Sequence, residues 1–105
     1  MKLEPIIVRS ARPPTVEVDW AALAAYIRFG KGKVAKTVRR DCDHCLITID
    51  LDRQGRLIGI ETIGETNIEI GAILKRAAVQ APHVDFSKAR YMRPHVGEDA
   101  EAAAT

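Results

Sequence analysis

The chain has 105 residues, with 16 Lys and Arg against 14 Asp and Glu, and its formal net charge is +2. A hydrophobic fraction of 47% and a charged fraction of 29% argue against disorder of the whole chain, and the length argues against two independent domains. No apolar run approaches the roughly 20 residues that span a bilayer, and residues 1–5 do not resemble a secretory signal. Two cysteines three positions apart cannot build a disulfide framework, so we expect a cytoplasmic protein without a membrane segment.

The N-terminal residues 1–14 contain three prolines, and residues 95–105 are acidic and rich in alanine. We therefore expect an N-terminal tail over 1–14, a single small domain over 15–94 and a flexible acidic tail over 95–105.

The segment from Val16 to Phe29 has two interpretations. Asp19 could cap a helix over 20–27, and the alanines there slightly favour that interpretation. The residues at both ends of the segment favour strands instead, which a turn after Asp19 would join.

The small net charge conceals segments of opposite sign. Residues 28–40 hold six basic residues and no acidic one, whereas residues 41–69 hold seven acidic residues and two basic ones. The six basic residues are candidates for binding a partner or nucleic acid: Arg28, Lys31, Lys33, Lys36, Arg39 and Arg40. The opposed segments can also pair within the fold or across a homodimer.

A β-hairpin is the clearest local element. Residues 46–51 and 56–63 are rich in Ile and Thr, and the turn between them carries Gly55. Glycine has no Cβ to clash, so we expect Gly55 to take a positive φ in a type I turn with a bulge.

The register of this hairpin follows from the turn. It places Leu51 opposite Leu57 and Ile49 opposite Gly59. Both faces then carry apolar residues, so we expect a helix to cover one face and a second sheet or another subunit to cover the other. Two apolar faces on so small a sheet predict a homodimer.

An amphipathic helix should follow the hairpin over about residues 67–81. Thr66 and Glu69 match a capping box, in which each side chain satisfies a free backbone N–H group. The apolar stripe consists of Ile70, Ile73, Leu74, Ala77 and Ala81. Pro82 should end the helix.

Several motifs together resemble a known family. They are Asp19, the run Ala24 to Phe29, the run Gly32 to Thr37, the run Ile49 to Asp52 and the run Gly55 to Glu61. This succession, over about residues 17–64, resembles the small bacterial and archaeal proteins grouped as domain of unknown function family 2283.

The resemblance implies a small antiparallel sheet with a C-terminal helix or tail, and it implies strand, turn and strand for the segment 16–29. It implies no enzymatic activity. Some genes of the family lie beside those of toxins, which implies an antitoxin-like role with a small protein partner.

Cys42-Asp43-His44-Cys45 is the most suggestive local motif. Such a pair can supply half of a zinc site, with His83 or His95 as further ligands, or it can form a redox pair. A second cysteine pair is missing, and the motif leads into a strand, where a redox pair normally opens a helix. We therefore expect no cofactor, and keep Cys42, His44 and Cys45 as the candidate ligands of a metal-binding alternative.

Four carboxylates form a second candidate set, namely Asp50, Asp52, Glu61 and Glu65. Paired carboxylates can bind a cation or do acid–base chemistry. The expected register puts Asp50 and Asp52 on the face opposite Glu61, so these groups should not converge. No candidate nucleophile or phosphate-binding glycine loop accompanies them, and we predict that the protein is not an enzyme.

Nucleic-acid binding through residues 28–40 is the first alternative function. Aromatic residues do not interleave with the basic ones, and the isoelectric point of 8.7 is below the usual level for such domains. Trp20 is better explained as a core or subunit-contact residue.

The sequence thus predicts an α+β fold with a small antiparallel sheet and one C-terminal amphipathic helix. It predicts a non-catalytic protein-interaction module that forms a homodimer. Structural roles fall to Gly55, Gly59, Thr66 and Glu69.

Overall fold

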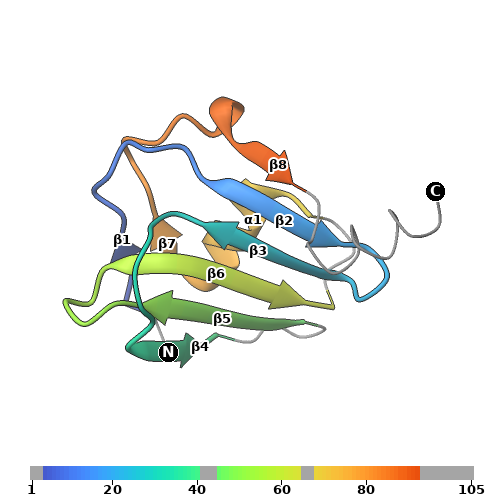
Figure 1. Ribbon diagram of the computed structural model, residues 1–105, viewed down its shortest axis with the longest axis horizontal. Helices are drawn as coiled ribbons and strands as arrows, with labels where there is room; N and C mark the ends of the chain where they lie inside the picture. Colours follow the sequence, from blue (N-terminus) through green and yellow to red (C-terminus); the bar gives the residue numbers. More distant parts are fainter. Residues whose placement is uncertain (1–3, 41–44, 65–67, 93–105) are drawn as a thin grey trace.

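The computed structural model describes residues 4–40, 45–64 and 68–92. It confirms the α+β class, with a six-stranded and mostly antiparallel sheet whose strand order is β4-β5-β6-β3-β2-β8 (Figure 1). The strands are β2 (Thr15–Asp19), β3 (Ala24–Arg28), β4 (Lys36–Arg39), β5 (Leu46–Leu51), β6 (Leu57–Ile63) and β8 (Arg90–Met92). Within the described residues, no helix has the length and apolar character that a bilayer crossing requires.

The helix α1 (Ile70–Ala77) is not at the C-terminal end of the domain. It is followed by the short strand β7 (Val79–Gln80), by a 3-10 turn over Phe86–Lys88 and by β8, which pairs in parallel with β2. The predicted position of the helix is therefore corrected, although its place over the sheet is as expected.

Part of the predicted N-terminal tail belongs to the folded domain. Strand β1 (Ile6–Ile7) pairs in parallel with β7, and the side chain of Val8 is only 7% exposed. The expectation of a tail over 1–14 was wrong for these residues because they supply the partner of β7 and part of the core. The predicted tail over 95–105 lies outside the described residues.

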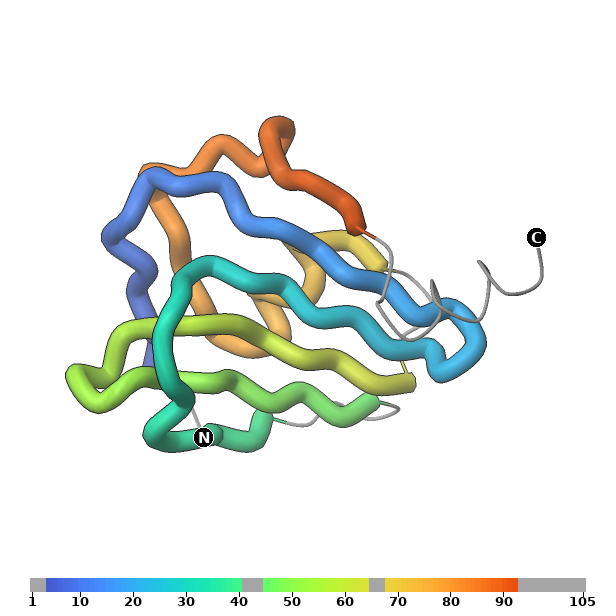
Figure 2. The backbone as a smooth tube through the Cα atoms, in the orientation of Figure 1, coloured from blue at the N-terminus to red at the C-terminus, as the bar shows by residue number. Residues whose placement is uncertain are grey.

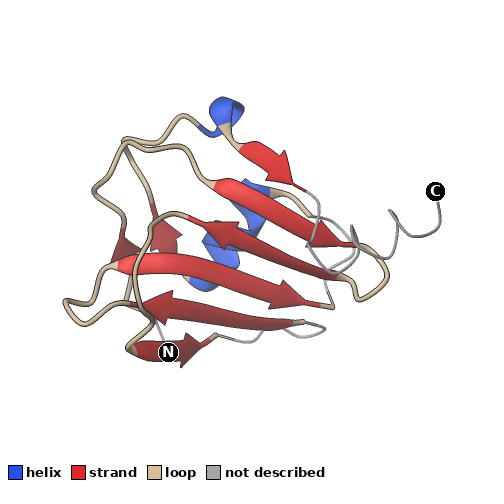
Figure 3. Cartoon of the chain, in the orientation of Figure 1, coloured by secondary structure: helices blue, strands red, loops and turns tan. Residues whose placement is uncertain are grey.

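The core lies between α1 and one face of the sheet, and Figure 3 shows the helix behind the strands. Ile27, Ile49 and Ile60 lie in register across β3, β5 and β6, and all three are fully buried. Ile73 of α1 packs against them from the helix. Burying one such side chain stabilises the fold by roughly 1.5–3 kcal/mol, so this layer holds the sheet and the helix together.

The segment 16–29 is a hairpin, as the resemblance implied, and the helical alternative was wrong. Strands β2 and β3 pair antiparallel, and the Asp19 side chain accepts a hydrogen bond from the Ala22 N–H at 3.2 Å inside the turn. Val16 and Ile27 are paired and fully buried. Their burial at alternating strand positions outweighs the weak helix propensity of the alanines.

The helix is shorter than predicted at both ends. Glu69 occupies the N-cap position without a side-chain capping bond, and Thr66 lies outside the described residues. At the other end Ala78 takes a left-handed conformation with φ of 56°, so the chain leaves the helix four residues before Pro82. Residues after Ala78 gain backbone bonds from β1 instead, which ends the helix earlier than the sequence pattern indicates.

The β5–β6 hairpin has the predicted turn. Gly55 has a φ of 81°, and its N–H donates to the Asp52 carbonyl at 3.0 Å. Leu51 lies opposite Leu57, as expected.

The rest of the register differs from the prediction by one residue. Ile49 pairs with Ile60, and Asp50 pairs with Gly59, because the register shifts between Asp50 and Leu51. Ile58 is thereby the extra residue of a bulge. The shift puts Ile49 and Ile60 together in the core and moves Asp50 and Glu61 to the same opposite face.

Among the residues that the structure describes, Thr62 is the buried polar one. Its side chain is fully buried, and its hydroxyl has no hydrogen-bond partner among the described residues. We expect Thr62→Val to raise the free energy of unfolding by about 1 kcal/mol, since a buried unpaired hydroxyl is replaced by a methyl group. Urea denaturation followed by circular dichroism measures the change, and a lower stability in the variant would show that the hydroxyl is satisfied.

Candidate functional site

The face of the sheet opposite α1 is here called the open face. Side chains alternate along each strand, so the register places the following residues on it: Thr37, Arg39, Thr48, Asp50, Gly59, Glu61, Tyr26, Arg28 and Glu17. The connection over residues 29–35 passes from β3 across the turn end of β5 and β6 to β4, as the tube in Figure 2 shows. No other described segment crosses this face in Figures 1 and 2.

Asp50 is the centre of a hydrogen-bonded cluster on the open face. The Tyr26 hydroxyl donates to Asp50 Oδ2 at 2.9 Å, and the Thr37 hydroxyl donates to Asp50 Oδ1 at 2.8 Å. Burial, reinforced by the bond to Asp50, raises the pKa of Tyr26 far above its usual value. Tyr26 therefore remains a protonated donor, and both oxygens of Asp50 are occupied within the chain.

Gly59 makes room for the Tyr26 ring. A Cβ atom at Gly59 would collide with the hydroxyl oxygen and the ring of Tyr26. The guanidinium carbon of Arg28 lies 4.9 Å from the centre of the same ring, a geometry that favours a cation–π interaction. The missing side chain at Gly59 therefore leaves the space that the Tyr26 ring occupies.

The acidic residues are arranged differently from the prediction. Asp50 and Glu61 share the open face, and the expectation that they lie on opposite faces was wrong because of the bulge at Ile58. Asp52 stays in the turn, where the Arg56 backbone N–H lowers the pKa of its carboxyl and the Arg56 side chain pairs with it at 2.9 Å. Glu65 lies outside the described residues.

The six basic residues do not form one surface. Pairing along β4 puts Lys36 beside Leu51 and Arg39 beside Thr48, hence on opposite faces of the sheet. Arg28 lies over the Tyr26 ring, while Lys31 and Lys33 lie in the exposed connection after β3.

Arg40 is bound within the chain. Its guanidinium donates to the Ala77 carbonyl at 2.6 Å, at the end of α1, and to the Glu4 carbonyl at 2.9 Å. A cation at the C-terminal end of a helix is stabilised by the carbonyl groups that lack helical partners. Arg40 therefore ties the residues after β4 to the helix and to the N-terminal segment.

We expect Arg40→Ala to lower the free energy of unfolding by about 2 kcal/mol, because hydrogen bonds from a charged donor to backbone carbonyls are lost. Lys36→Ala is the matched control, since this residue is exposed on β4, and its expected effect is within about 0.5 kcal/mol. Denaturation curves of both variants measure the difference. Equal stabilities would show that Arg40 does not hold the helix end.

The candidate metal ligands are only partly within the described structure. Cys42 and His44 lie outside it, as does His95, and His83 is exposed. Cys45 is half-buried next to β5 and is disulfide-bonded. Among residues 4–40, 45–64 and 68–92, no three His, Cys, Asp or Glu residues are grouped as a metal site.

An apolar strip crosses one end of the open face. Leu46, Ile63 and Ala24 pair in register across β5, β6 and β3, and the Leu23 carbonyl accepts the Gly64 N–H at 2.8 Å. We define the strip as Leu23, Ala24, Leu46 and Ile63 together with Trp20 of the adjoining β2–β3 turn. Trp20 is 63% exposed, Leu23 is 40% exposed and Ile63 is 39% exposed.

The strip was not predicted as a unit. The hairpin register expected from the sequence, which lacks the bulge at Ile58, does not pair Leu46 with Ile63. The alternation of apolar residues alone could therefore not bring these two side chains together. Trp20 was predicted to be a core or subunit-contact residue, and its exposure excludes the core. Large exposed apolar side chains that adjoin one another are typical of interaction surfaces.

Comparisons of the chain with family models, with curated proteins and with solved structures found no match. The resemblance to the family of unknown function therefore remains a prediction.

Proposed function

We propose that this protein is a non-catalytic interaction module that forms a homodimer through the open face of its sheet. The apolar strip is the observation that carries the proposal. It combines the exposed Leu23 and Ile63 at one end of the six-stranded sheet with the exposed Trp20 of the adjoining β2–β3 turn. Tryptophan is among the residues that contribute most to the binding energy of protein interfaces.

The polar groups next to the strip can be covered without losing hydrogen bonds. Asp50 already accepts from Tyr26 and Thr37, so burying this carboxylate under a partner leaves neither oxygen unpaired. An unsatisfied polar group at an interface costs roughly 1–3 kcal/mol, and this arrangement avoids that cost for the cluster. The cluster therefore supports association as well as the stability of the sheet.

Charge complementarity favours a second copy of the chain as the occupant. Arg28 and Arg39 alternate with Glu17 and Glu61 across the open face. A twofold axis brings each residue opposite a different residue of an identical surface, so a face with both signs can complement itself. A polyanion such as nucleic acid would meet the two glutamates, and this argues against the basic segment as a nucleic-acid surface.

Sedimentation velocity over micromolar to near-millimolar concentrations tests the proposal. We expect the wild-type chain to sediment as a dimer. Ile63→Asp should raise the dissociation constant of this dimer at least about tenfold, because a charge would be buried at the strip. Tyr91→Asp is the matched control, since Tyr91 is 63% exposed and pairs with Val16, which faces away from the open face. Its dimerisation should equal that of the wild type.

Two results would overturn the homodimer. One is a monomer at every concentration, and the other is a dimer that Ile63→Asp does not weaken. If the chain is a monomer that forms a stoichiometric complex with a small toxin through the strip, then the strip binds that toxin and not a second copy. Oligonucleotide binding that Lys33→Gln and Lys36→Gln weaken would favour the basic segment instead.

A further inference from the structure

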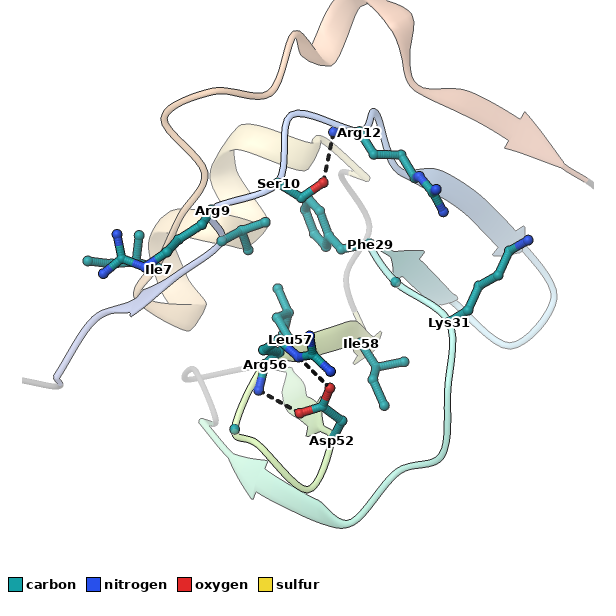
Figure 4. Close-up of a pocket in the computed structure, with 13 residues that line it drawn as sticks. Ile7, Arg9, Ser10, Arg12, Phe29, Lys31, Asp52, Arg56, Leu57 and Ile58 are labelled. Atoms are coloured by element: carbon teal, nitrogen blue, oxygen red, sulfur yellow. Dashed lines mark hydrogen bonds and ion pairs between the residues drawn. The ribbon is translucent and has the colours of Figure 1, made fainter.

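A cavity of about 510 Å³ lies at the turn end of the sheet, away from the apolar strip. Figure 4 shows that its walls come from three parts of the chain, namely residues 7–12, residues 29–31 and the β5–β6 turn. The volume is within the range of sites that hold small molecules. The cavity shares no residue with the strip, so substitutions in the two places test separate features.

The floor of the cavity is apolar and the rim is cationic. Val8, Phe29, Leu57 and Ile58 are all buried residues of this floor. The charged lining residues are Arg9, Arg12, Lys31, Arg56 and Asp52. Four cations therefore line the cavity, against a single carboxylate, and Arg9 extends to the side opposite Arg12 and Lys31 (Figure 4).

The carboxylate neutralises only one of these cations. Asp52 Oδ2 pairs with Arg56 Nε at 2.9 Å, and Asp52 Oδ1 accepts the backbone N–H groups of Gln54 and Arg56. No ion pair among the described residues involves Arg9, Arg12 or Lys31. In Figure 4, Arg12 and Lys31 extend on the same side of the cavity. Their two positive charges are available to an anion at that rim.

We propose that this cavity binds a small organic phosphate, with its apolar group over Phe29 and Leu57 and its phosphate at Arg12 and Lys31. Cationic side chains that are not neutralised match a dianion better than a monoanion, and arginine can bind phosphate oxygens with two parallel hydrogen bonds. Inorganic phosphate would leave the apolar floor unused. A nucleic-acid duplex is too wide for a cavity of this size.

NMR titration of the isotope-labelled full chain with phenyl phosphate tests the proposal. The amide signals of Gly30, Gly55 and Leu57 should shift, because these residues line the cavity. Phenol and inorganic phosphate should each bind at least about tenfold more weakly, since each lacks one of the two contacts. Benzoate, with a single negative charge, should bind more weakly than phenyl phosphate.

Charge-matched variants distinguish binding in the cavity from nonspecific attraction of an anion to a basic protein. Arg12→Gln combined with Lys31→Gln should weaken phenyl phosphate binding by about tenfold or more. Lys33→Gln combined with Lys36→Gln removes the same charge outside the cavity and should leave binding unchanged. All four residues are exposed, so folding should be retained.

The proposal is overturned if phenyl phosphate shifts none of the cavity amides. It is also overturned if phenol, benzoate or inorganic phosphate binds as tightly as phenyl phosphate, or if both double variants weaken binding equally.

Discussion

Replacing Ile60 with Ala is expected to lower the free energy of unfolding by about 4 kcal/mol. Ile60 lies on β6 near the middle of the sheet, between Ile27 and Ile49, and is fully buried. Its truncation removes buried methyl groups and leaves a cavity that the paired strands cannot close. Urea denaturation followed by circular dichroism measures the change.

Ile7→Ala is the matched control for this substitution. Ile7 lies on β1 and is 45% exposed, so the same truncation should cost less than about 1 kcal/mol. Similar losses at both positions would contradict the placement of Ile60 at the centre of the core.

Gly59→Val is expected to lower the free energy of unfolding by about 3 kcal/mol. The new side chain would occupy the space of the Tyr26 ring, which its hydrogen bond to Asp50 holds in place. Either the ring leaves its position and that bond is lost, or the strands separate locally. The change in stability is again measured by urea denaturation.

A double-mutant cycle shows whether the Tyr26 ring is the cause. In a Tyr26→Ala background the cost of Gly59→Val should fall to less than about half, because the space above Gly59 is then empty. The register expected from the sequence, without the bulge at Ile58, would instead place Gly59 opposite Ile49 in the core. An undiminished cost in the Tyr26→Ala background would support that register and contradict the bulge.

Local patterns were sufficient for some elements of the fold. The turn at Gly55 was predictable because few residues tolerate a positive φ, and the apolar spacing identified the helical residues Ile70 to Ala77. These features depend on short-range geometry alone. They required no knowledge of which segments pair.

Other elements depend on contacts between distant segments. The helix ends early because Val79 and Gln80 pair with β1, and residues 1–14 carried no periodic pattern that would indicate a strand there. Arg40 looked like one more basic residue of a charged segment, whereas the fold places its guanidinium at the end of α1. Such roles could not be derived from the spacing of residue types along the sequence.

The candidate site was the least predictable feature. A single bulge residue, Ile58, changes which side chains share a face, and it has no glycine or proline signal of its own. Without the bulge, neither the pairing of Leu46 with Ile63 nor the shared face of Asp50 and Glu61 can be foreseen. The apolar strip and the Tyr26–Asp50 cluster both follow from this one shift.

Isotope-filtered NOE spectroscopy on equal parts of labelled and unlabelled chains tests the proposed homodimer most directly, since it records only contacts between copies. Association through the strip predicts intermolecular NOEs from the Trp20 indole to the methyl groups of Ile63 or Leu46. A dimer whose intermolecular NOEs all come from other surfaces, or a sample with none, would contradict association through the open face.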